Sequence, residues 1–329
     1  KNTDKHMEEL VKHNIPSFEI VIANLYPFEE VIKNPNSTED DVIENIDIGG
    51  HSLIRGSAKN HNKVLVVVDP DDYALIEKDF DNIDRKQFAQ KAFKYVTNYD
   101  IAISNYFNED MIYRQYTKSN SLKYGLNPQQ KFAGIYYNIQ IQEKLPFTIL
   151  NGNPGYINFL DAIYSWNLVV DIRKGLDITS CASFKHTSPA GVGLAIEMDE
   201  KLKEIYYVAD KELSNTAIAY VRARNADPMC SYGDFLSIND IVDECTAKLL
   251  SFDVSDGIVA LGYTPEALDI LKKKKKGAYV ILQANLDDLT DLEIRELHGV
   301  VLIQESNKKI TSFNSLKNIV TQNKNLPAS

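Results

Sequence analysis

The chain contains Val64-Leu65-Val66-Val67-Val68, followed directly by Asp69-Pro70-Asp71-Asp72. An uncharged run rich in β-branched residues is typical of a strand buried on both faces, as the strands of parallel sheets are. An aspartate followed by proline is a signal for the start of a helix. The junction therefore predicts a strand that leads into a helix, the repeating unit of an α/β layer.

Segments on both sides of this junction extend the pattern. Residues 18–25 (FEIVIANL) predict another strand, the acidic stretch 38–45 predicts a helix, and a second helix is expected from Ser52 towards His61. Residues 85–107 predict a long helix. Its apolar residues recur at helical spacing, at Phe88, Ala92, Tyr95 and Ala102. We therefore expect an α/β domain in this half of the chain.

The stretch from Tyr113 to Lys123 is polar and has no apolar period, so we place a boundary there between domains 1–117 and 118–329. In the second domain, 157–175 predicts an amphipathic helix that carries the only tryptophan, Trp166. Another helix is expected over 264–273. The expected strands are 132–139, 147–150, 248–252, 257–261, 278–283 and 299–304. This alternation again predicts the α/β class.

The composition excludes several classes of protein. A length of 329 residues allows two domains, and 44% hydrophobic with 25% charged residues is ordinary for a globular protein. The net charge of −10 argues against general affinity for nucleic acid or an anionic membrane. The cysteines Cys181, Cys230 and Cys245 lack the spacing of a disulfide framework or a metal site, which favours the cytosol. Neither a signal peptide nor a membrane-spanning apolar run is visible.

The stretch Cys181–Gly191 (CASFKHTSPAG) places Lys185 beside His186 at the end of an apolar run. We expect a buried strand that leaves its sheet there, followed by a turn at Pro189-Ala190-Gly191. A neighbouring positive charge favours the neutral imidazole, which can accept a proton. The lysine could stabilise negative charge on an oxygen. The alternative is a plain surface pair in a loop.

A second candidate lies in the first domain, where Gly49-Gly50 precedes a predicted helix. Backbone N–H groups at such a glycine turn can face an anion. Lys59 lies about 13 Å further along a straight helix, so one small anion cannot touch both places. Asn24 and Tyr26 follow the first strand and could hold a polar heterocycle, or form an ordinary turn. The glycine turn is more simply a helix start with a basic face.

Three further stretches have a functional and a plain interpretation. Lys123 and Tyr124 adjoin a glycine turn and could bind phosphate, or belong to a linker. Gly233-Asp234 and Asp256-Gly257 each place an acid beside a glycine at a strand edge, where Asp256 could bind a ribose or merely close a turn. The lysine run 272–276 is more simply a solvated helix end than a phosphate site.

Together these stretches resemble one family. NLYPFEEVI, ENIDIGG, SAKNH and VVVDPDDY, followed by LKYGLNPQQ, NGNPGYINFLDA, SFKHTSPAG, RARNADPMCSYGDF and VSDGIVALGY, keep the order and spacing of the bifunctional purine-biosynthesis enzymes. These enzymes join an aminoimidazole-carboxamide ribotide (AICAR) formyltransferase to an inosinate (IMP) cyclohydrolase. The resemblance implies a methylglyoxal-synthase-like α/β domain followed by a cytidine-deaminase-like α/β sandwich. It also implies a cytosolic homodimer that uses 10-formyltetrahydrofolate as co-substrate and no metal.

The resemblance also implies roles for individual residues. His186 would accept the proton of the attacking amine, and Lys185 would stabilise the formyl oxyanion. The residues implied to bind AICAR are Lys123, Tyr124, Asn158, Gly233 and Asp256. In the first domain Lys59 would be the acid/base residue that closes formylated AICAR (FAICAR) to IMP. Tyr26 and Asp47 would assist it, and Asn24 and Ile48 would bind the nucleotide.

The chain also departs from the family. Lys123 stands where the family has arginine, which replaces a bidentate contact by a point charge. Gln129 stands where the family has histidine. We expect the first domain to lack its N-terminal segment and the second to lack its C-terminal half, and this fragment to be poorly active. The alternative function is an inactive remnant or dimerising module that keeps at most cyclohydrolase activity.

Overall fold

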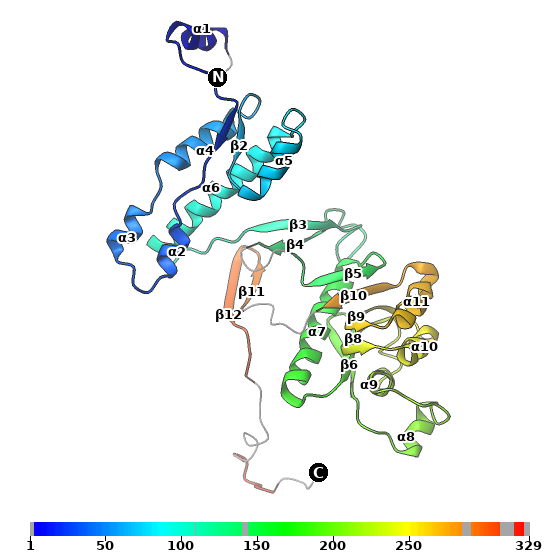
Figure 1. Ribbon diagram of the computed structural model, residues 1–329. Coiled ribbons are helices and arrows are strands. Elements are labelled where there is room, and N and C mark those ends of the chain that lie inside the picture. Colours follow the sequence, from blue (N-terminus) through cyan, green and yellow to red (C-terminus); the bar gives the residue numbers. More distant parts are fainter. Residues whose placement is uncertain (1–2, 109, 140–143, 285–290, 310–318, 326–329) are drawn as a thin grey trace. The chain divides into compact units, whose positions relative to one another are not determined.

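The computed structural model describes residues 3–108, 110–139, 144–284, 291–309 and 319–325 (Figure 1). The chain divides into two compact units, Lys1–Arg114 (unit 1) and Gln115–Ser329 (unit 2). The division expected from the sequence lies a few residues later, between Thr117 and Lys118. The structure assigns no function to either unit, so the identity of each domain stays a prediction.

Unit 1 contains a short parallel sheet, in which β1 (Ile20–Ile22) pairs with β2 (Leu65–Val67). All of β2 is buried, as the uncharged run predicted. The cluster around Val66 includes Ile54 of one helix and Ala92 and Val96 of another. The helices of unit 1 are α1 (Asp4–Lys12), α2 (Phe28–Lys33), α3 (Glu39–Glu44), α4 (Gly49–Lys59), the short 3-10 helix η1 (Pro70–Asp72), α5 (Tyr73–Lys78) and α6 (Arg85–Phe107).

Unit 2 is built on a six-stranded mixed sheet in the order β5-β10-β9-β8-β6-β7. The strands are β5 (Phe147–Asn151), β6 (Ser180–Lys185), β7 (Ser188–Leu194), β8 (Asp234–Val242), β9 (Ser255–Tyr263) and β10 (Val280–Ala284). The neighbours β8, β9 and β10 are parallel, and the other pairs are antiparallel. The α/β class expected from the sequence is therefore confirmed.

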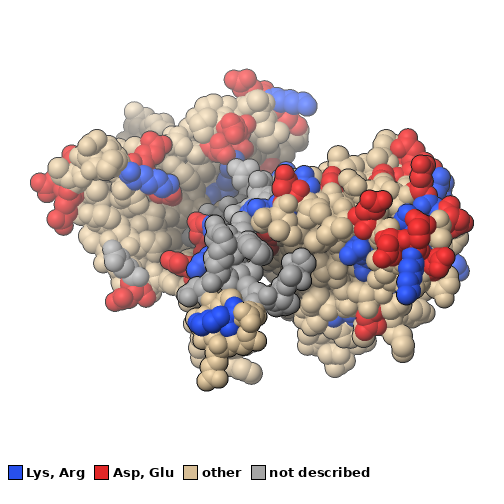
Figure 2. Space-filling view, turned by 90° about the horizontal axis from the view of Figure 1, so that it is seen from below, with Lys and Arg blue, Asp and Glu red and all other residues tan. Residues whose placement is uncertain are grey.

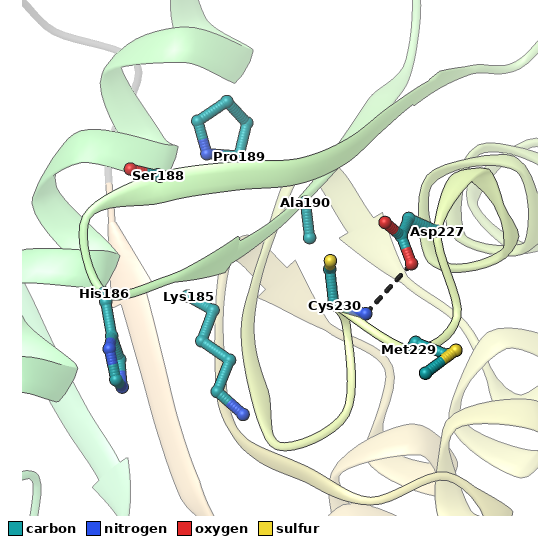
Figure 3. A pocket seen from close by; sticks show the side chains of 8 residues that line it. All are labelled: Lys185, His186, Ser188, Pro189, Ala190, Asp227, Met229 and Cys230. Carbon is teal, nitrogen blue, oxygen red and sulfur yellow. Dashed lines mark hydrogen bonds between the residues drawn. The ribbon is translucent and has the colours of Figure 1, made fainter.

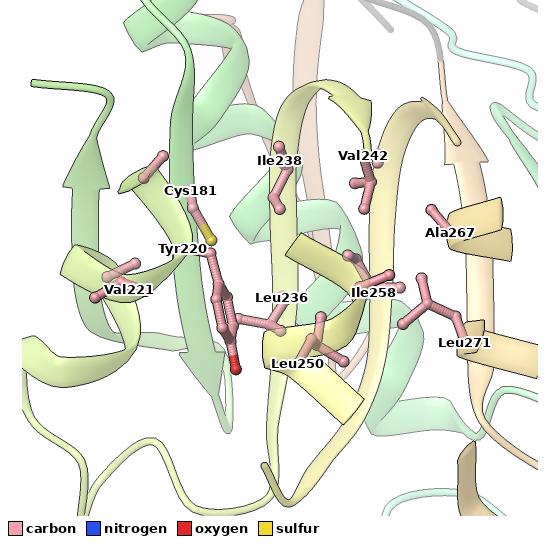
Figure 4. Close-up of a cluster of buried hydrophobic side chains, with 14 of the residues drawn as sticks. Cys181, Tyr220, Val221, Leu236, Ile238, Val242, Leu250, Ile258, Ala267 and Leu271 are labelled. Carbon is pink, nitrogen blue, oxygen red and sulfur yellow. The ribbon is translucent and has the colours of Figure 1, made fainter. Parts of the chain in front are cut away.

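Helices cover both faces of this sheet (Figure 1). One face packs on α7 (Tyr156–Leu176) through Trp166. The other face packs on α9 (Asn215–Ala226), α10 (Glu244–Phe252) and α11 (Pro265–Lys273) (Figure 4). Successive strand residues alternate between the two cores, as the period of a strand requires: Leu236 faces the α9–α11 side and Phe235 faces α7.

The remaining described elements of unit 2 are α8 (Glu200–Ile205), the 3-10 helix η2 (Lys274–Gly277), and two antiparallel pairs, β3 (Tyr116–Ser121) with β4 (Gly134–Asn138) and β11 (Leu292–Leu297) with β12 (Val300–Glu305). Within the described residues we find no helix with the length and apolar character that a membrane crossing requires. Acidic and basic side chains are interspersed on the face in Figure 2.

One expected strand was wrong, and the boundaries of other expected elements differ in detail. Residues 248–252 form part of α10, because Asp243 caps this helix at the backbone N–H of Thr246 and a short apolar run does not distinguish a strand from a helix. The polar stretch from Tyr113 to Lys123, for which only a domain boundary was expected, contains the strand β3. The helix expected from Ser52 already begins at Gly49.

The turn expected at Pro189-Ala190-Gly191 was also wrong, since these residues lie inside β7. Proline is tolerated there because β7 is an edge strand of the sheet. Glycine is needed at 191 because a Cβ atom would lie 2.1 Å from the carbonyl oxygen of Ala223 on α9. The glycine therefore allows close packing of helix and strand, and the turn lies before it.

Candidate active site

The hairpin between β6 and β7 carries the predicted catalytic pair. Lys185 ends β6 and pairs with Ser188, which begins β7, so His186 and Thr187 form a two-residue turn. Both have positive φ, 52° and 66°, the combination of a type I′ turn, where asparagine and glycine are usual. A β-branched threonine is rare in this region. Such conformations cost about 1–3 kcal/mol each and cluster at functional sites.

This turn brings neighbouring side chains to the same side. Consecutive residues of a regular strand point to opposite faces of the sheet. Figure 3 shows Lys185 and His186 extending from the hairpin in the same direction. Together with residues of β7 and of a loop before β8, they line a pocket of about 490 Å³. The other lining residues are Ser188, Pro189, Ala190, Asp227, Met229 and Cys230.

The loop before β8 holds the ammonium group of Lys185. Its Nζ atom donates a hydrogen bond to the carbonyl oxygen of Tyr232. The next residue, Gly233, has φ 75°, and a Cβ atom there would lie 3.3 Å from Lys185 Nζ. Glycine thus permits both the backbone conformation and the close approach of the lysine. The predicted residues Lys185, His186 and Gly233 therefore lie together.

A buried carboxyl group fixes this loop to β6. Asp234 is fully buried and accepts a hydrogen bond of 2.5 Å from Ser183 Oγ, and Ser183 Oγ also lies 3.0 Å from Ser231 Oγ. The guanidinium of Arg224 is 3.9 Å from the Asp234 carboxylate. Burial raises the pKa of Asp234 to about 6, although Ser183 and Arg224 act in the opposite direction. The strand and the loop that surround Lys185 thus share one polar cluster.

A second carboxyl group supports the turn. Asp161 on α7 is only 5% exposed, and its Oδ1 accepts a 2.6 Å hydrogen bond from the backbone N–H of Thr187. Burial raises the pKa of Asp161, while the N–H of Thr187 and the charge of His186 oppose that rise. This residue was not predicted from the sequence. In the structure Asp161 is an acidic residue among the buried positions of α7, four residues before the buried Ser165. An acid on the apolar face of a predicted helix is the signal that could have found it.

Of the other predicted residues of unit 2, Asn158 and Asp256 have partners within the protein, and Lys123 and Tyr124 are exposed. Asn158 Oδ1 accepts the backbone N–H of Gly155 at 2.9 Å and so caps α7. Asp256 forms an ion pair of 2.5 Å with Lys275. Lys123 and Tyr124 are exposed in the loop after β3. The charge of Asp256 also raises the pKa of Asp161, the residue that supports the turn.

The lysine run is only partly the solvated helix end that was expected. Lys272 and Lys273 are exposed. Lys275 pairs with Asp256, and the Nζ atom of Lys274 lies 5.4 Å from the centre of the Tyr279 ring. Burial lowers the pKa of Lys274. Two lysines of the run thus contact residues at the beginnings of the neighbouring strands β9 and β10.

Four of the predicted residues of unit 1 lie in the loop after β1 (Asn24 and Tyr26) and just before α4 (Asp47 and Ile48), whereas Lys59 lies at the other end of that helix. Asn24 Nδ2 donates to the carbonyl oxygen of Val68 at 2.7 Å, which links the two strand ends. Asp47 Oδ1 accepts the N–H of Gly50 at 2.6 Å. Ile48 and Tyr26 are exposed, and Lys59 is exposed at the last position of α4. The glycine turn therefore receives a carboxylate of the chain itself.

Two tyrosines of α6, whose role was not predicted from the sequence, hold these loops. The hydroxyl of Tyr99 accepts the N–H of Asp47 and donates to the carbonyl oxygen of Asn45, both at 2.7 Å. The hydroxyl of Tyr95 accepts the N–H of Leu25 at 3.0 Å. Their spacing of four residues on one helix face could have indicated this shared role.

Among the described residues no cluster of three or more His, Cys, Asp or Glu could hold a metal ion.

Comparisons with known proteins give a consistent result. The family described as AICARFT/IMPCHase bienzyme matches residues 57–328. The bifunctional purine biosynthesis protein PurH of Lysinibacillus sphaericus is 33% identical over 317 residues, which cover 93% of this chain and 58% of that protein. The protein of the same description from Dictyostelium discoideum is 32% identical over 364 residues, covering 97% and 64%.

The chain thus spans less than two thirds of the length of the curated relatives it matches. A crystal structure of ForH is 29% identical and covers 32% of this chain and 59% of ForH. Its TM-score of 0.29 is too low to support an argument about the fold.

Proposed function

Since this chain belongs to the AICARFT/IMPCHase bienzyme family, we propose that unit 2 transfers a formyl group from 10-formyltetrahydrofolate to the 5-amino group of AICAR. The observation that carries this proposal is the pair Lys185 and His186, which line one pocket and extend the same way from a strained turn. In an acyl transfer, an imidazole in this position can accept the proton of the attacking amine, and the ammonium can stabilise the oxyanion that forms on the acyl group.

The proposed reaction follows from the chemistry of the two groups. The amine nitrogen of AICAR attacks the formyl carbon, and the neutral imidazole of His186 accepts the proton that the amine loses. The formyl oxygen becomes an oxyanion, which the ammonium of Lys185 stabilises. The bond from the formyl carbon to the folate nitrogen N10 then breaks. The imidazolium returns its proton to N10, so that FAICAR and tetrahydrofolate leave.

The proposed AICAR contacts require some exchange of partners. Asn158 and Asp256 would bind AICAR together with Gly233, and in this structure Asp256 is paired with Lys275. Lys123 and Tyr124 are exposed and can approach a ligand. Lys123 would meet an anionic group as a point charge.

For unit 1 we propose the closure of FAICAR to IMP with loss of water. Lys59 would be the acid/base residue, with help from Tyr26 and Asp47, while Asn24 and Ile48 would bind the nucleotide. The loops that carry Asn24 and Asp47 are held by Tyr95 and Tyr99, which supports a preorganised site. We further propose a cytosolic homodimer, with a methylglyoxal-synthase-like unit 1 and a cytidine-deaminase-like unit 2.

Two assays test the proposal. The native full-length gene product receives AICAR and 10-formyltetrahydrofolate in one assay and FAICAR alone in the other, and FAICAR and IMP are quantified by liquid chromatography with mass spectrometry. We expect Lys185→Ala and His186→Ala to reduce formyl transfer about 10²- to 10⁴-fold and to leave ring closure unchanged. The exposed lysine in Lys201→Ala serves as the matched control.

Each other result has a definite meaning. Equal loss of both reactions in the Lys185 and His186 variants would contradict two separate sites. If the protein without substitutions closes the ring but transfers no formyl group, its only activity is that of a cyclohydrolase. Absence of both reactions would favour the alternative, a dimerising module without catalysis.

A further inference from the structure

The turn that carries His186 is stabilised from outside the hairpin. His186 and Thr187 both adopt positive φ, and neither is glycine. In a two-residue hairpin the N–H groups of the central residues have no partner in the strand ladder. The N–H of Thr187 is nevertheless satisfied, because Asp161 on α7 accepts it at 2.6 Å. The backbone N–H of His186 also interacts with this carboxyl group.

Asp161 is placed to act on the backbone rather than on a substrate. It is 5% exposed, and the residues that line the pocket come from the hairpin and from the loop before β8. A buried carboxylate without a partner is costly, so the acid and the turn depend on one another. The strand next to the turn is fixed separately, because Ser183 on β6 bonds Asp234.

From these contacts we propose that Asp161 is a positioning residue for formyl transfer: by holding the left-handed His186–Thr187 turn, it keeps the imidazole on the same side as the ammonium of Lys185. This inference rests on the proposed function of unit 2. Without the contact, the turn would relax towards ordinary backbone angles and His186 would leave its place beside Lys185. An ångström-scale displacement of a catalytic group can cost about 10²-fold in rate.

The kinetic test asks whether a glycine at position 187 restores the activity that Asp161→Ala loses, as it should if Asp161 acts only on the backbone of the turn. Asp161→Ala should lower kcat for formyl transfer about 10- to 100-fold with little change in KM for AICAR. Asp161→Asn keeps an acceptor oxygen and should lose less. Thr187→Gly in the Asp161→Ala background should restore kcat to within a few-fold of Thr187→Gly alone, because glycine adopts positive φ without strain. Failure of this rescue, or a change confined to KM, would overturn the proposal.

A second measurement needs no catalytic activity. The amide hydrogen of Thr187 is bonded to a buried acceptor, so its exchange with solvent, followed by NMR with ¹⁵N-threonine labelling, should be slow in the unmodified chain and faster in Asp161→Ala. Asp240→Ala is the matched control, because Asp240 accepts a hydrogen bond of 2.6 Å from Thr179 Oγ1 just before β6, at the end opposite Lys185. Unchanged exchange at Thr187 in Asp161→Ala would overturn the inference.

The two proposals fail in different ways. A native full-length protein that transfers no formyl group would overturn the proposed function and with it the kinetic role of Asp161. Normal formyl transfer in both the unmodified chain and Asp161→Ala would overturn the role of Asp161 alone. If Asp161→Ala does not fold, Asp161→Asn with and without Thr187→Gly carries the same comparison.

Discussion

At the scale of single residues, the environment of Lys185 depends on a glycine that the sequence singled out for another reason. Gly233 was expected to bind AICAR. In the structure its positive φ and missing side chain also let the loop before β8 approach the lysine ammonium. The residue could be found from the sequence as a glycine beside an acid, but its contact with Lys185 joins residues far apart in the chain.

Gly233→Ala should therefore damage both the backbone and the lysine. We expect a loss of about 1–2 kcal/mol in the free energy of unfolding, from an alanine forced into a left-handed conformation. Formyl transfer should fall about tenfold or more, because the Cβ atom would crowd Lys185 Nζ. Gly299→Ala is the control, since Gly299 has φ 79° and a Cβ atom there would meet nothing within 4 Å. Equal activity in the two variants would contradict the crowding.

The raised pKa of Asp234 makes the free energy of unfolding depend on pH. Burial raises its pKa from the ordinary value of 3.8 to about 6, so between these values the folded state holds a proton that the unfolded state releases. The stability that Asp234 contributes is thus greatest below pH 3.8 and is lost as the pH rises through about 6. The two pKa values correspond to about 3 kcal/mol.

Urea unfolding followed by the fluorescence of the buried Trp166 measures this effect in unit 2. Asp234→Asn should remove the decline in stability between about pH 4 and pH 7. Asp243→Asn is a contrasting control. Burial raises the pKa of Asp243, but hydrogen bonds from Ser214 and Thr246 together lower it by more, so the net shift of its pKa is downward. That carboxyl contributes stability at higher pH and loses it as the pH falls. An unchanged slope in Asp234→Asn would contradict the prediction.

At the scale of elements, predictions from the sequence succeeded where a pattern was unambiguous. The uncharged run 64–68 and the long helix 85–107 are present as expected, because burial on both faces and helical periodicity each leave a clear signature. The run 248–252 was wrong, since so short a run fits either a helix or a strand. The direction of His186 could not be predicted, because it depends on a positive φ that neither histidine nor threonine signals.

Helix α6 holds the loop that carries Asp47 in the proposed site of unit 1. The hydroxyl of Tyr99 bonds two backbone groups of the loop that carries Asp47. Tyr99→Phe leaves both groups unpaired, so we expect a loss of about 1–3 kcal/mol in the stability of unit 1. Ring closure of FAICAR should slow as the loop loosens. Tyr106→Phe on the same helix is the control, because its side chain is 36% exposed; an equal effect there would exclude a role specific to Tyr99.

At the scale of the whole molecule, each unit has a core of its own. The cluster of unit 1 surrounds Ile54 and Val66, whereas the sheet of unit 2 separates a cluster around Leu236 from one around Trp166. A chain with separate cores unfolds in separate steps when few contacts cross between them. Since the only tryptophan lies in unit 2, its fluorescence reports that unit alone.

Two core substitutions test this independence. Ile54 and Leu236 are each fully buried, and replacing either by alanine should cost about 2–5 kcal/mol. Leu236→Ala should move the urea midpoint of Trp166 fluorescence to lower concentration, while Ile54→Ala should leave it in place. Hydrogen exchange measured by mass spectrometry should show the opposite pattern for peptides of β2 and α4. If Ile54→Ala shifted the fluorescence midpoint as far as Leu236→Ala does, the two units would unfold as one, and a substitution in one proposed active site would then be expected to weaken the other.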